Sequence, residues 1–346
     1  MGVNYVAVQW NRQKKLYDLA LVGSVATFLI AFAVVTKLRF PQVTDEIMLI
    51  RAFGTAALGL LHLILCIGPL CRLSTQFLPL LYNRRHAGVV CFLLGLIHAA
   101  LVTITYHAGG DTHPILSIFV TSVVPTSTSA VPFQPLGFIA LVILFLMAST
   151  SHDFWLTNLS APVWKTLHML VYVAYVLVIL HVVFGILQAE NSPTYTGIMI
   201  LGLGSVLGLH IAAASREQPK DRDHDMLEEN DGFIDACTVA DIPEKRARMV
   251  KLSGERVAIF KCDGRVFAVS NVCQHQNGPL GEGRIVDGCI TCPWHGYQYR
   301  PENGASPPPF VEKVPTFNVR IRAGRVFVHP TPNPAGTEAL SGVIEP

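Results

Sequence analysis

The sequence predicts a multi-domain protein in which an all-α bundle of six transmembrane helices precedes a small all-β domain. Of its 346 residues, 51% are hydrophobic and only 14% are charged, which is too apolar for an ordinary soluble protein. The charges are unevenly distributed: residues 1–215 hold 10 Lys or Arg and 6 Asp or Glu, whereas residues 216–346 hold 16 and 18. We therefore expect a membrane domain over 1–215 and a water-soluble region after it.

Six apolar runs are candidate membrane spans, because a transmembrane helix needs roughly 20 apolar residues. They cover residues 18–37, 50–70, 87–107, 136–151, 165–187 and 195–214. Cytoplasmic loops carry an excess of Lys and Arg. The segments before the first run, after the second and after the sixth are basic, whereas residues 108–135 and 188–194 contain no Lys or Arg. The pattern predicts a multi-pass protein of the plasma or inner membrane with both termini in the cytoplasm.

The C-terminal part changes character after the last apolar run. Residues 216–231 are polar and highly charged, which is typical of a solvated linker. Short β-rich runs punctuated by Gly and Asp then predict an all-β domain over 232–331, and residues 332–346 are expected to form a flexible tail. The net charge of +2 and the lack of a basic stripe argue against nucleic-acid binding.

Two closely spaced Cys/His pairs lie within the predicted β domain. One residue separates Cys273 from His275, two residues separate Cys292 from His295, and sixteen residues lie between the pairs. Zinc fingers usually pair like with like, as two cysteines and then two histidines. One Cys and one His in each pair fit a [2Fe–2S] cluster in which two thiolates hold one iron and two imidazoles hold the other. Zinc is the alternative that the spacing leaves open.

With this C-x-H…C-x-x-H pattern, residues 233–330 resemble a Rieske domain. Rieske proteins of cytochrome bc complexes carry a disulfide where Gly278 and Trp294 stand here, and a serine where Tyr297 stands. The resemblance is therefore to the ferredoxin type that serves oxygenases. It implies a reduction potential in the lower part of the Rieske range, because fewer donors reach the sulfurs. The lack of a disulfide also suits a reducing cytoplasm.

Four histidines in the predicted spans are candidate haem ligands, because ionisable side chains inside a bilayer are costly and generally functional. His86 and His168 are expected near the cytoplasmic face, and His98 and His181 are expected deeper, toward the outside. Two imidazoles at one depth on facing helices suit a bis-histidine haem. The step from His86 to His98 is 12 residues, and the step from His168 to His181 is 13 residues. In a helix these steps rotate the second histidine of each helix by about 120° and −140°, and they place the two histidine pairs about 18 Å apart along the helix axis. Histidines that hydrogen-bond within the bundle are the alternative.

The surroundings of these histidines resemble the ferric reductase-like transmembrane family over about residues 50–190. The stretches Arg84–Gly88 and Trp164–Tyr172, together with His98 and His181, carry the similarity. The family includes ferric reductases and NADPH oxidases, and the resemblance implies a six-helix cytochrome with b-type haem, here two haems. A Rieske-like domain stands where a flavin domain would be, and no G-x-G-x-x-G motif follows a strand. Direct oxidation of NAD(P)H by this chain is therefore not expected.

Together these features predict a membrane electron-transfer protein. A cytoplasmic reductase or ferredoxin would reduce the [2Fe–2S] cluster, and single electrons would then pass through the inner and the outer haem to an acceptor outside. The sequence shows no constellation of catalytic acid, base or nucleophile. Two alternatives stay open. One is a membrane-anchored Rieske ferredoxin that serves a separate oxygenase or reductase without a functional haem, and the other is a quinol-linked subunit of a larger complex.

Overall fold

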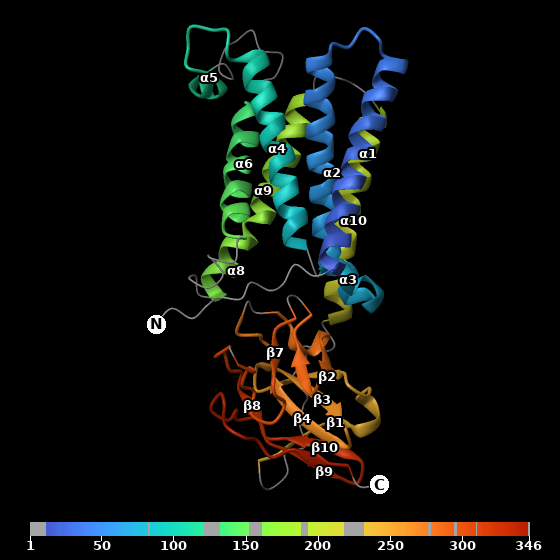
Figure 1. Ribbon diagram of the computed structural model, residues 1–346, viewed down its shortest axis with the longest axis vertical. Coiled ribbons are helices and arrows are strands. Elements are labelled where there is room, and N and C mark those ends of the chain that lie inside the picture. The colour runs from blue at the N-terminus through green and yellow to red at the C-terminus, as the bar shows by residue number, and fades with distance from the viewer. Residues whose placement is uncertain are drawn as a thin grey trace. The chain divides into compact units, whose positions relative to one another are not determined.

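The computed structural model describes most of the chain, and Figure 1 shows its ribbon. The described residues are 12–81, 84–120, 132–151, 161–187, 193–217, 232–275, 278–293, 296–308 and 310–344. The chain divides into two compact units, Met1–Ile211 and Ala212–Pro346. The described part of the first unit is helical, and the described strands all lie in the second unit. The multi-domain fold class predicted from the sequence is thereby confirmed.

The first unit consists of apolar helices joined by short segments. Its described elements are α1 (Arg12–Arg39), α2 (Asp45–Leu73), η1 (Thr75–Phe77), α3 (Leu78–Leu81), α4 (Arg84–Tyr106), α5 (Pro114–Val120), α6 (Gln134–Ser149), α8 (Ala161–Met169), α9 (Val171–Val182), the π-helical turn η3 (Val183–Leu187) and α10 (Pro193–Glu217). Within the described residues, five stretches are long and apolar enough to cross a membrane: Lys15–Arg39, Asp45–Leu73, Arg84–Tyr106, Thr166–Leu187 and Pro193–Arg216. They coincide with five of the six predicted spans.

The remaining predicted span, at 136–151, corresponds to the shorter helix α6, which has 16 residues. Its C-terminal end is marked by hydroxyl groups that bond back to the helix: Thr150 Oγ1 donates to the Leu146 carbonyl and Ser151 Oγ donates to the Met147 carbonyl, each at 2.7 Å. Side-chain bonds of this kind satisfy carbonyls that the helix end leaves open. Five of the six predicted spans are thus helices long enough to cross a membrane, whereas the described helix at the sixth position is shorter.

The helices pack around α4 and leave apolar side chains on their outer faces. Helix α2 packs against α1 and α4, and α6 packs against α4 and α9. Ala87, Cys91 and Leu94 of α4 are buried in the shared core. Large apolar residues elsewhere stay exposed, for example Leu38 of α1 at 76%. Since water does not favour such a surface, this distribution fits helices that face lipid.

The second unit contains three small antiparallel sheets. Its strands are β1 (Ile234–Thr238), β2 (Ala247–Leu252), β3 (Glu255–Cys262), β4 (Arg265–Ser270), β5 (Arg284–Val286), β6 (Cys289–Thr291), β7 (Gln298–Tyr299), β8 (Thr316–Phe317), β9 (Val319–Arg322), β10 (Arg325–Val328) and β11 (Gly342–Val343), and the short helices are η4 (Val239–Asp241) and η5 (Leu280–Glu282). The strand orders are β1-β10-β9, β11-β4-β3-β2 with β8 beside β4, and β5-β6-β7.

Two-residue turns set the register of the hairpins. Asp263 and Gly264 join β3 to β4, and both have positive φ, 50° and 72°. A turn with positive φ at both positions matches the twist of an antiparallel pair, and Asp-Gly is a favoured sequence for it. Asp287 and Gly288, with φ of 50° and 74°, join β5 to β6 in the same way. The second of these hairpins carries one of the predicted ligand loops.

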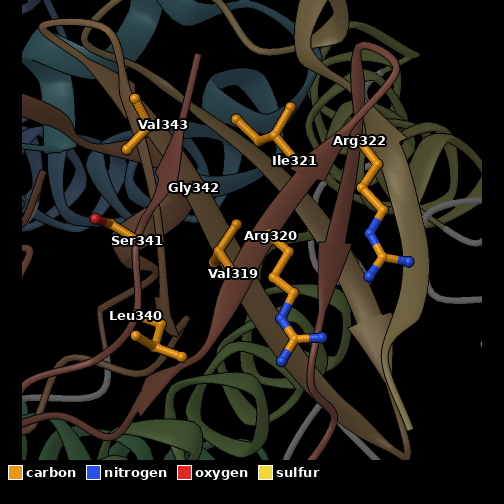
Figure 2. A pocket seen from close by; sticks show the side chains of 8 residues that line it. All are labelled: Val319, Arg320, Ile321, Arg322, Leu340, Ser341, Gly342 and Val343. Carbon is orange, nitrogen blue, oxygen red and sulfur yellow. The ribbon is translucent and has the colours of Figure 1, made fainter. Parts of the chain in front are cut away.

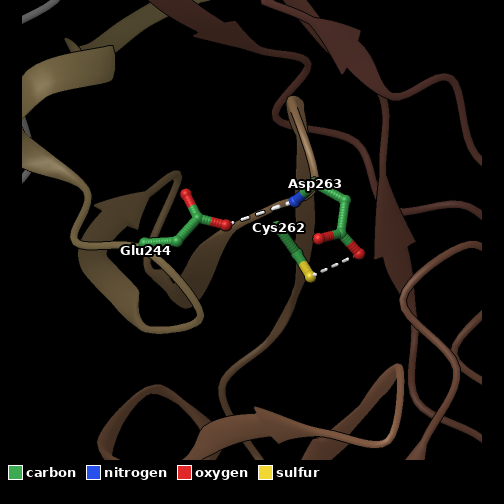
Figure 3. A group of neighbouring side chains, drawn as sticks. All are labelled: Glu244, Cys262 and Asp263. Carbon is green, nitrogen blue, oxygen red and sulfur yellow. Dashed lines mark hydrogen bonds between the residues drawn. The ribbon is translucent and has the colours of Figure 1, made fainter.

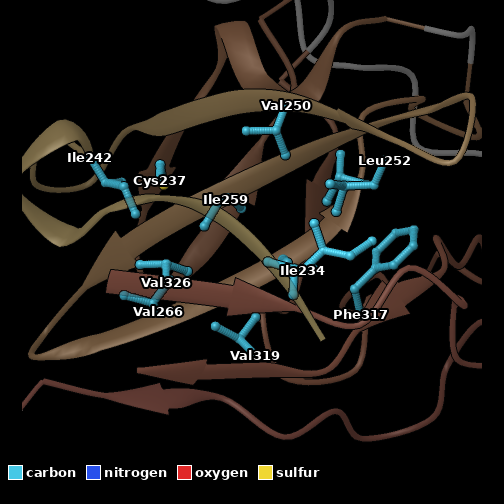
Figure 4. Packing of buried hydrophobic residues seen from close by; sticks show 14 residues of the cluster. Ile234, Cys237, Ile242, Val250, Leu252, Ile259, Val266, Phe317, Val319 and Val326 are labelled. Carbon is cyan, nitrogen blue, oxygen red and sulfur yellow. The ribbon is translucent and has the colours of Figure 1, made fainter. Parts of the chain in front are cut away.

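Strand β3 separates two apolar cores because its residues point alternately to its two faces. Val257 and Ile259 enter the core between the two larger sheets, which Figure 4 shows with Phe317 and Val326. Phe260 on the opposite face enters a second core, which also contains both predicted cysteine ligands. The fold therefore attaches the ligand loops to a packed apolar base.

The C-terminal residues differ from the expected flexible tail. Within the described part, which ends at residue 344, β11 pairs with β4 through Gly342 opposite Val266. The Arg265 guanidinium also donates to Ser341 Oγ at 2.6 Å and 3.1 Å. A strand of two residues is too short to show an alternating pattern, which is why the sequence did not reveal it. The predicted linker lies outside the described residues except for its first two residues, which continue α10.

Candidate metal centres

Two short loops of the β domain carry the predicted cluster ligands. Cys273 and His275 follow the end of β4, and Cys292 lies between β6 and β7. The Cys292 N–H donates to the Tyr297 carbonyl at 2.7 Å, so the backbone closes the second loop into a tight turn. His295 lies outside the described residues. The structure therefore places three of the four predicted ligands.

Both ligand thiols are buried, and a hydroxyl group lies next to one of them. Cys273 is 1% exposed and Cys292 is 2% exposed, and no disulfide joins any of the eight cysteines. The Tyr299 hydroxyl lies 3.3 Å from Cys273 Sγ and accepts the Gln274 N–H at 3.0 Å, which leaves its own proton for the sulfur. Burial and the charge of Cys273 raise the pKa of Tyr299, so this hydroxyl stays a donor. Donation to a ligand sulfur favours the more negative, reduced state of a cluster.

The His275 imidazole is held by an aromatic stack. Its ring lies parallel to the Tyr297 ring, with the centroids 4.7 Å apart and the planes at 10°. The Tyr297 hydroxyl donates to a carboxylate oxygen of Glu312, and the Phe310 ring lies 4.8 Å from the Tyr297 ring. Burial, followed by the hydrogen bond to Glu312, raises the pKa of Tyr297. These contacts fix the plane of a ligand that the sequence predicted, through residues whose roles it left open.

The described donors fit a [2Fe–2S] cluster of the predicted kind. Such a cluster takes two thiolates on one iron and two imidazoles on the other. The described loops supply two buried thiols that are not used in disulfides, together with one imidazole whose plane is fixed. When bound, the cluster would supply one-electron redox chemistry. The protein residues would hold it, keep water from the sulfurs and direct the Tyr299 hydroxyl at one of them.

A second group of ligand-type atoms belongs to a hairpin turn. Glu244, Cys262 and Asp263 have one ligand atom each within 4.8 Å of the others (Figure 3). The atoms are already engaged, because the Cys262 thiol donates to Asp263 Oδ2 at 3.3 Å and the Asp263 N–H donates to Glu244 Oε1 at 3.2 Å. Burial and the Asp263 carboxylate raise the pKa of Cys262, which disfavours the thiolate that a metal needs. This group stabilises the turn.

A surface pocket of about 390 Å³ lies elsewhere in the β domain (Figure 2). It is lined by Val319–Arg322 of β9 and by Leu340–Val343. The two linings are joined by a backbone hydrogen bond of 2.8 Å from Val319 to Leu340. None of the three placed cluster ligands lines this pocket. It results from the packing of the C-terminal segment against β9.

In the helical bundle, the structure brings together one of the two predicted pairs of haem ligands. The rings of His98 on α4 and His181 on α9 have centroids 6.4 Å apart and planes at 85°. Two imidazoles that bind one iron from opposite sides have centroids roughly 6 Å apart, since a metal–nitrogen bond is about 2 Å. His98 Nδ1 donates to the Ile50 carbonyl at 2.9 Å, and His181 Nδ1 donates to the Phe133 carbonyl at 2.8 Å. Both rings therefore keep Nε2, the usual ligand atom, for a metal.

Each of these two rings rests against a glycine of a neighbouring helix. A Cβ at Gly54 of α2 would lie 2.9 Å from His98 Nδ1, and a Cβ at Gly137 of α6 would lie 2.7 Å from His181 Nδ1. Each glycine follows the accepting carbonyl by four residues. The lack of a side chain at each glycine therefore leaves space for an imidazole. The sequence analysis did not identify these two glycines.

The other predicted pair, His86 and His168, has separate partners. His86 Nδ1 lies 2.9 Å from both carboxylate oxygens of Asp18 on α1. His168 Nδ1 donates to the Trp164 carbonyl at 3.0 Å, its ring stacks on the Trp164 ring at 3.8 Å, and Nε2 lies 3.5 Å from Ser151 Oγ. Within the described residues, the hydrogen bonds and ring contacts of His168 do not include His86. The inner haem therefore stays a prediction.

His62 of α2 is a further polar residue of the bundle, for which a core hydrogen bond is the expected role. Its Nδ1 donates to the Leu58 carbonyl at 2.8 Å, and its ring meets Tyr175 edge-on at 5.3 Å. A Cβ at Gly202 of α10 would lie 2.5 Å from its Nε2. Within the described part of the chain, His62 Nε2 and the Tyr175 hydroxyl are buried without a hydrogen-bond partner.

Two family profiles match the chain in separate regions. Residues 53–179 match the profile described as ferric reductase like transmembrane component, and residues 232–318 match the Rieske [2Fe–2S] domain. The order and position of the matches agree with the resemblances seen in the sequence. The second match selects iron–sulfur over zinc for the loops that carry Cys273 and Cys292.

Individual relatives are similar to a limited part of the chain. The ferredoxin subunit of a biphenyl dioxygenase from a Pseudomonas species is 34% identical over 99 residues, which are 28% of this chain and 90% of the relative. The ferredoxin component of an alkene monooxygenase system from Xanthobacter autotrophicus is 29% identical, over 31% of this chain and 88% of the relative. A cholesterol 7-desaturase from Xenopus laevis is 37% identical over 25% of this chain, and the chain spans only 21% of that relative. Among solved structures, a ferredoxin of Sphingomonas yanoikuyae B1 is 28% identical, covers 29% of this chain and 99% of its own, and has a TM-score of 0.27.

Proposed function

We propose that the chain passes single electrons between a cytoplasmic cluster and b-type haem, toward an acceptor across the membrane. Residues 53–179 match the ferric reductase-like transmembrane model, and residues 232–318 match the Rieske [2Fe–2S] model. Membrane electron transfer follows from the joining of these two domains in one chain. The passage of electrons through haem, the direction of electron flow and the side of the membrane on which each domain lies are proposals.

The observation that carries the haem route is the arrangement of His98 and His181. Their centroid separation of 6.4 Å suits bis-histidine ligation, and both Nδ1 atoms are fixed by backbone carbonyls. Each ring also rests against a glycine of a neighbouring helix, which leaves room for the imidazole. A bound haem would supply a one-electron couple there, while the helices orient the imidazoles and exclude water.

On the cytoplasmic side, we propose that Cys273, His275, Cys292 and His295 hold the cluster. The positive-inside pattern of the loops supports placing both termini, and therefore the β domain, in the cytoplasm. The similar ferredoxins are named as components of oxygenase systems, which supports a soluble reductase or ferredoxin as the electron donor. The acceptor outside is not assigned to a chemical class.

A second candidate function is a membrane-anchored ferredoxin that serves a separate oxygenase or reductase. The names of the similar ferredoxins favour it, since each belongs to an oxygenase system. In that case the bundle would be an anchor without a functional haem, and the fit between His98 and His181 would be coincidental. The two candidate functions therefore differ in whether the purified protein contains haem.

The experiment is a cofactor analysis of the full-length protein purified from membranes. We expect two irons and two acid-labile sulfides per chain in a cluster with a Rieske-type EPR signal, together with a b-type haem absorbance that shifts on reduction. Haem content is measured independently as the pyridine haemochrome. An intact cluster without any haem would support the anchored ferredoxin and rule out the transmembrane route.

A further inference from the structure

The carboxylate of Glu312 contacts a tyrosine that stacks on a proposed iron ligand, His275. The Tyr297 ring covers the His275 imidazole, and the Tyr297 hydroxyl donates to Glu312 Oε2. The same oxygen accepts the Val311 N–H at 3.1 Å. Both bonds use Glu312 as an acceptor. The contacts thus form a chain from the Glu312 carboxylate through Tyr297 to the imidazole of His275.

The loop that carries Glu312 is held in place by its backbone. The Ser306 N–H donates to the Glu312 carbonyl at 3.0 Å, and the Phe310 N–H donates to the Pro307 carbonyl at 3.1 Å. These two backbone bonds do not involve the Glu312 side chain, which joins the loop only through the Val311 N–H. The same carboxylate oxygen reaches outside the loop, to the hydroxyl of Tyr297.

Among the residues that the structure describes, Glu312 forms no ion pair with a base. The ion pairs of the β domain include Lys261 with Glu244 and Arg325 with Asp235. A partly buried charge that lacks a counter-ion acts over a longer distance than a paired surface charge. Its nearest polar contact is the tyrosine that lies against His275.

We infer that Glu312 is a positioning residue for the cluster: it holds Tyr297 flat against His275, and its negative charge lowers the reduction potential of the cluster. Reduction adds one electron to the cluster, and a nearby anion disfavours that added negative charge. The inference rests on the proposed function, because it assumes a cluster bound by His275. It concerns only this chain's own residues and does not depend on the identity of donor or acceptor.

The test compares potentials of the full-length protein measured by EPR-monitored redox titration. E312Q keeps the size and an acceptor oxygen but removes the charge. We expect a shift of the reduction equilibrium of roughly tenfold toward the reduced cluster, which is about 59 mV for one electron. E338Q is the matched control, because Glu338 is an exposed glutamate of the same domain. E338Q is expected to leave the potential unchanged, and E312D is expected to restore it in part.

A second variant tests whether Glu312 acts through Tyr297. Y297F keeps the stacked ring and removes the hydroxyl that reaches Glu312. We expect Y297F to change the potential by itself, and E312Q to have a smaller effect in the Y297F background than in the wild type. Equal effects in both backgrounds would contradict a role through Tyr297.

The outcomes separate this inference from the function on which it rests. If the wild type shows no Rieske-type EPR signal, the proposed function fails. If the signal is present and E312Q, E312D and E338Q share one potential, only the role of Glu312 fails. If E312Q does not retain its cluster, E312D and Y297F still decide, because each preserves part of the network.

Discussion

The His98 and His181 imidazoles face each other across the helical bundle with their ring centroids 6.4 Å apart and their planes nearly perpendicular. Each ring donates from Nδ1 to a backbone carbonyl and rests against a glycine four residues farther along the same neighbouring helix. Two side chains from different helices are thus fixed in the same way. This shared geometry leads to the first two predictions.

Filling one glycine niche should release haem without unfolding the bundle. G54A places a methyl group 2.9 Å from His98 Nδ1, so the ring must move. We expect G54A to lose more than half of its haem, measured as pyridine haemochrome per chain. G59A on the same helix is the control, because nothing lies within 4 Å of a Cβ there. Alanine favours a helix over glycine by about 1 kcal/mol, so G59A should remain stable with full haem.

Removal of an imidazole tests the ligand assignment directly. H181A removes one of the two proposed haem ligands, and we expect the low-spin bis-histidine spectrum to disappear while the iron–sulfur signal stays. H210A is the control, since His210 contacts Tyr172 and not the pair. If the optical spectrum of H181A equals that of H210A, His181 is not a haem ligand.

The Tyr299 hydroxyl should raise the potential of the cluster. Its proton is directed at Cys273 Sγ, and this bond is stronger when the cluster is reduced. Y299F should therefore lower the midpoint potential, by about 59 mV if the reduction equilibrium changes tenfold. Loss of one buried hydrogen bond should also lower the free energy of unfolding by about 1 kcal/mol. A higher potential in Y299F would refute the assigned direction.

Thr238 and Asp241 form a capping box at the start of the short helix η4, and we expect this pair to make the β domain sensitive to acid. Hydrogen bonds from the Thr238 side chain and backbone lower the pKa of Asp241. A carboxyl group whose pKa is lowered by folding stabilises the folded state above its unfolded pKa and loses this effect as the pH falls through the folded pKa. We expect the difference in melting temperature between wild type and D241N to be present at neutral pH, to shrink as the pH falls below about 4, and to vanish below the lowered pKa of Asp241. A difference that does not change with pH would show that Asp241 contributes only packing.

The sequence alone pointed to those candidate ligands that depend on local spacing. Cys273, His275 and Cys292 were proposed because ligands on one loop lie close in sequence, and His98 and His181 were proposed because ionisable groups in apolar helices are rare. The order of the two domains followed from the charge distribution. These signals can all be observed within a short window of residues.

The remaining features depend on contacts between distant segments. Gly54 and Gly137 gain their meaning only when α2 and α6 pack beside His98 and His181. Glu312 lies 37 residues after His275 in the sequence, and no sequence motif links the two residues. The pairing of β11 with β4 was missed for the same reason, because two residues show no periodicity.

The central claim is that one chain passes an electron from its cluster to its haem. The most direct measurement is anaerobic rapid-mixing spectroscopy of full-length protein in liposomes, in which a reductant that cannot cross the bilayer reduces the cluster and haem absorbance is followed. We predict that haem reduction follows cluster reduction in the wild type and is abolished in C292A, which retains haem but lacks the cluster. Equal rates of haem reduction in the wild type and C292A would contradict the account.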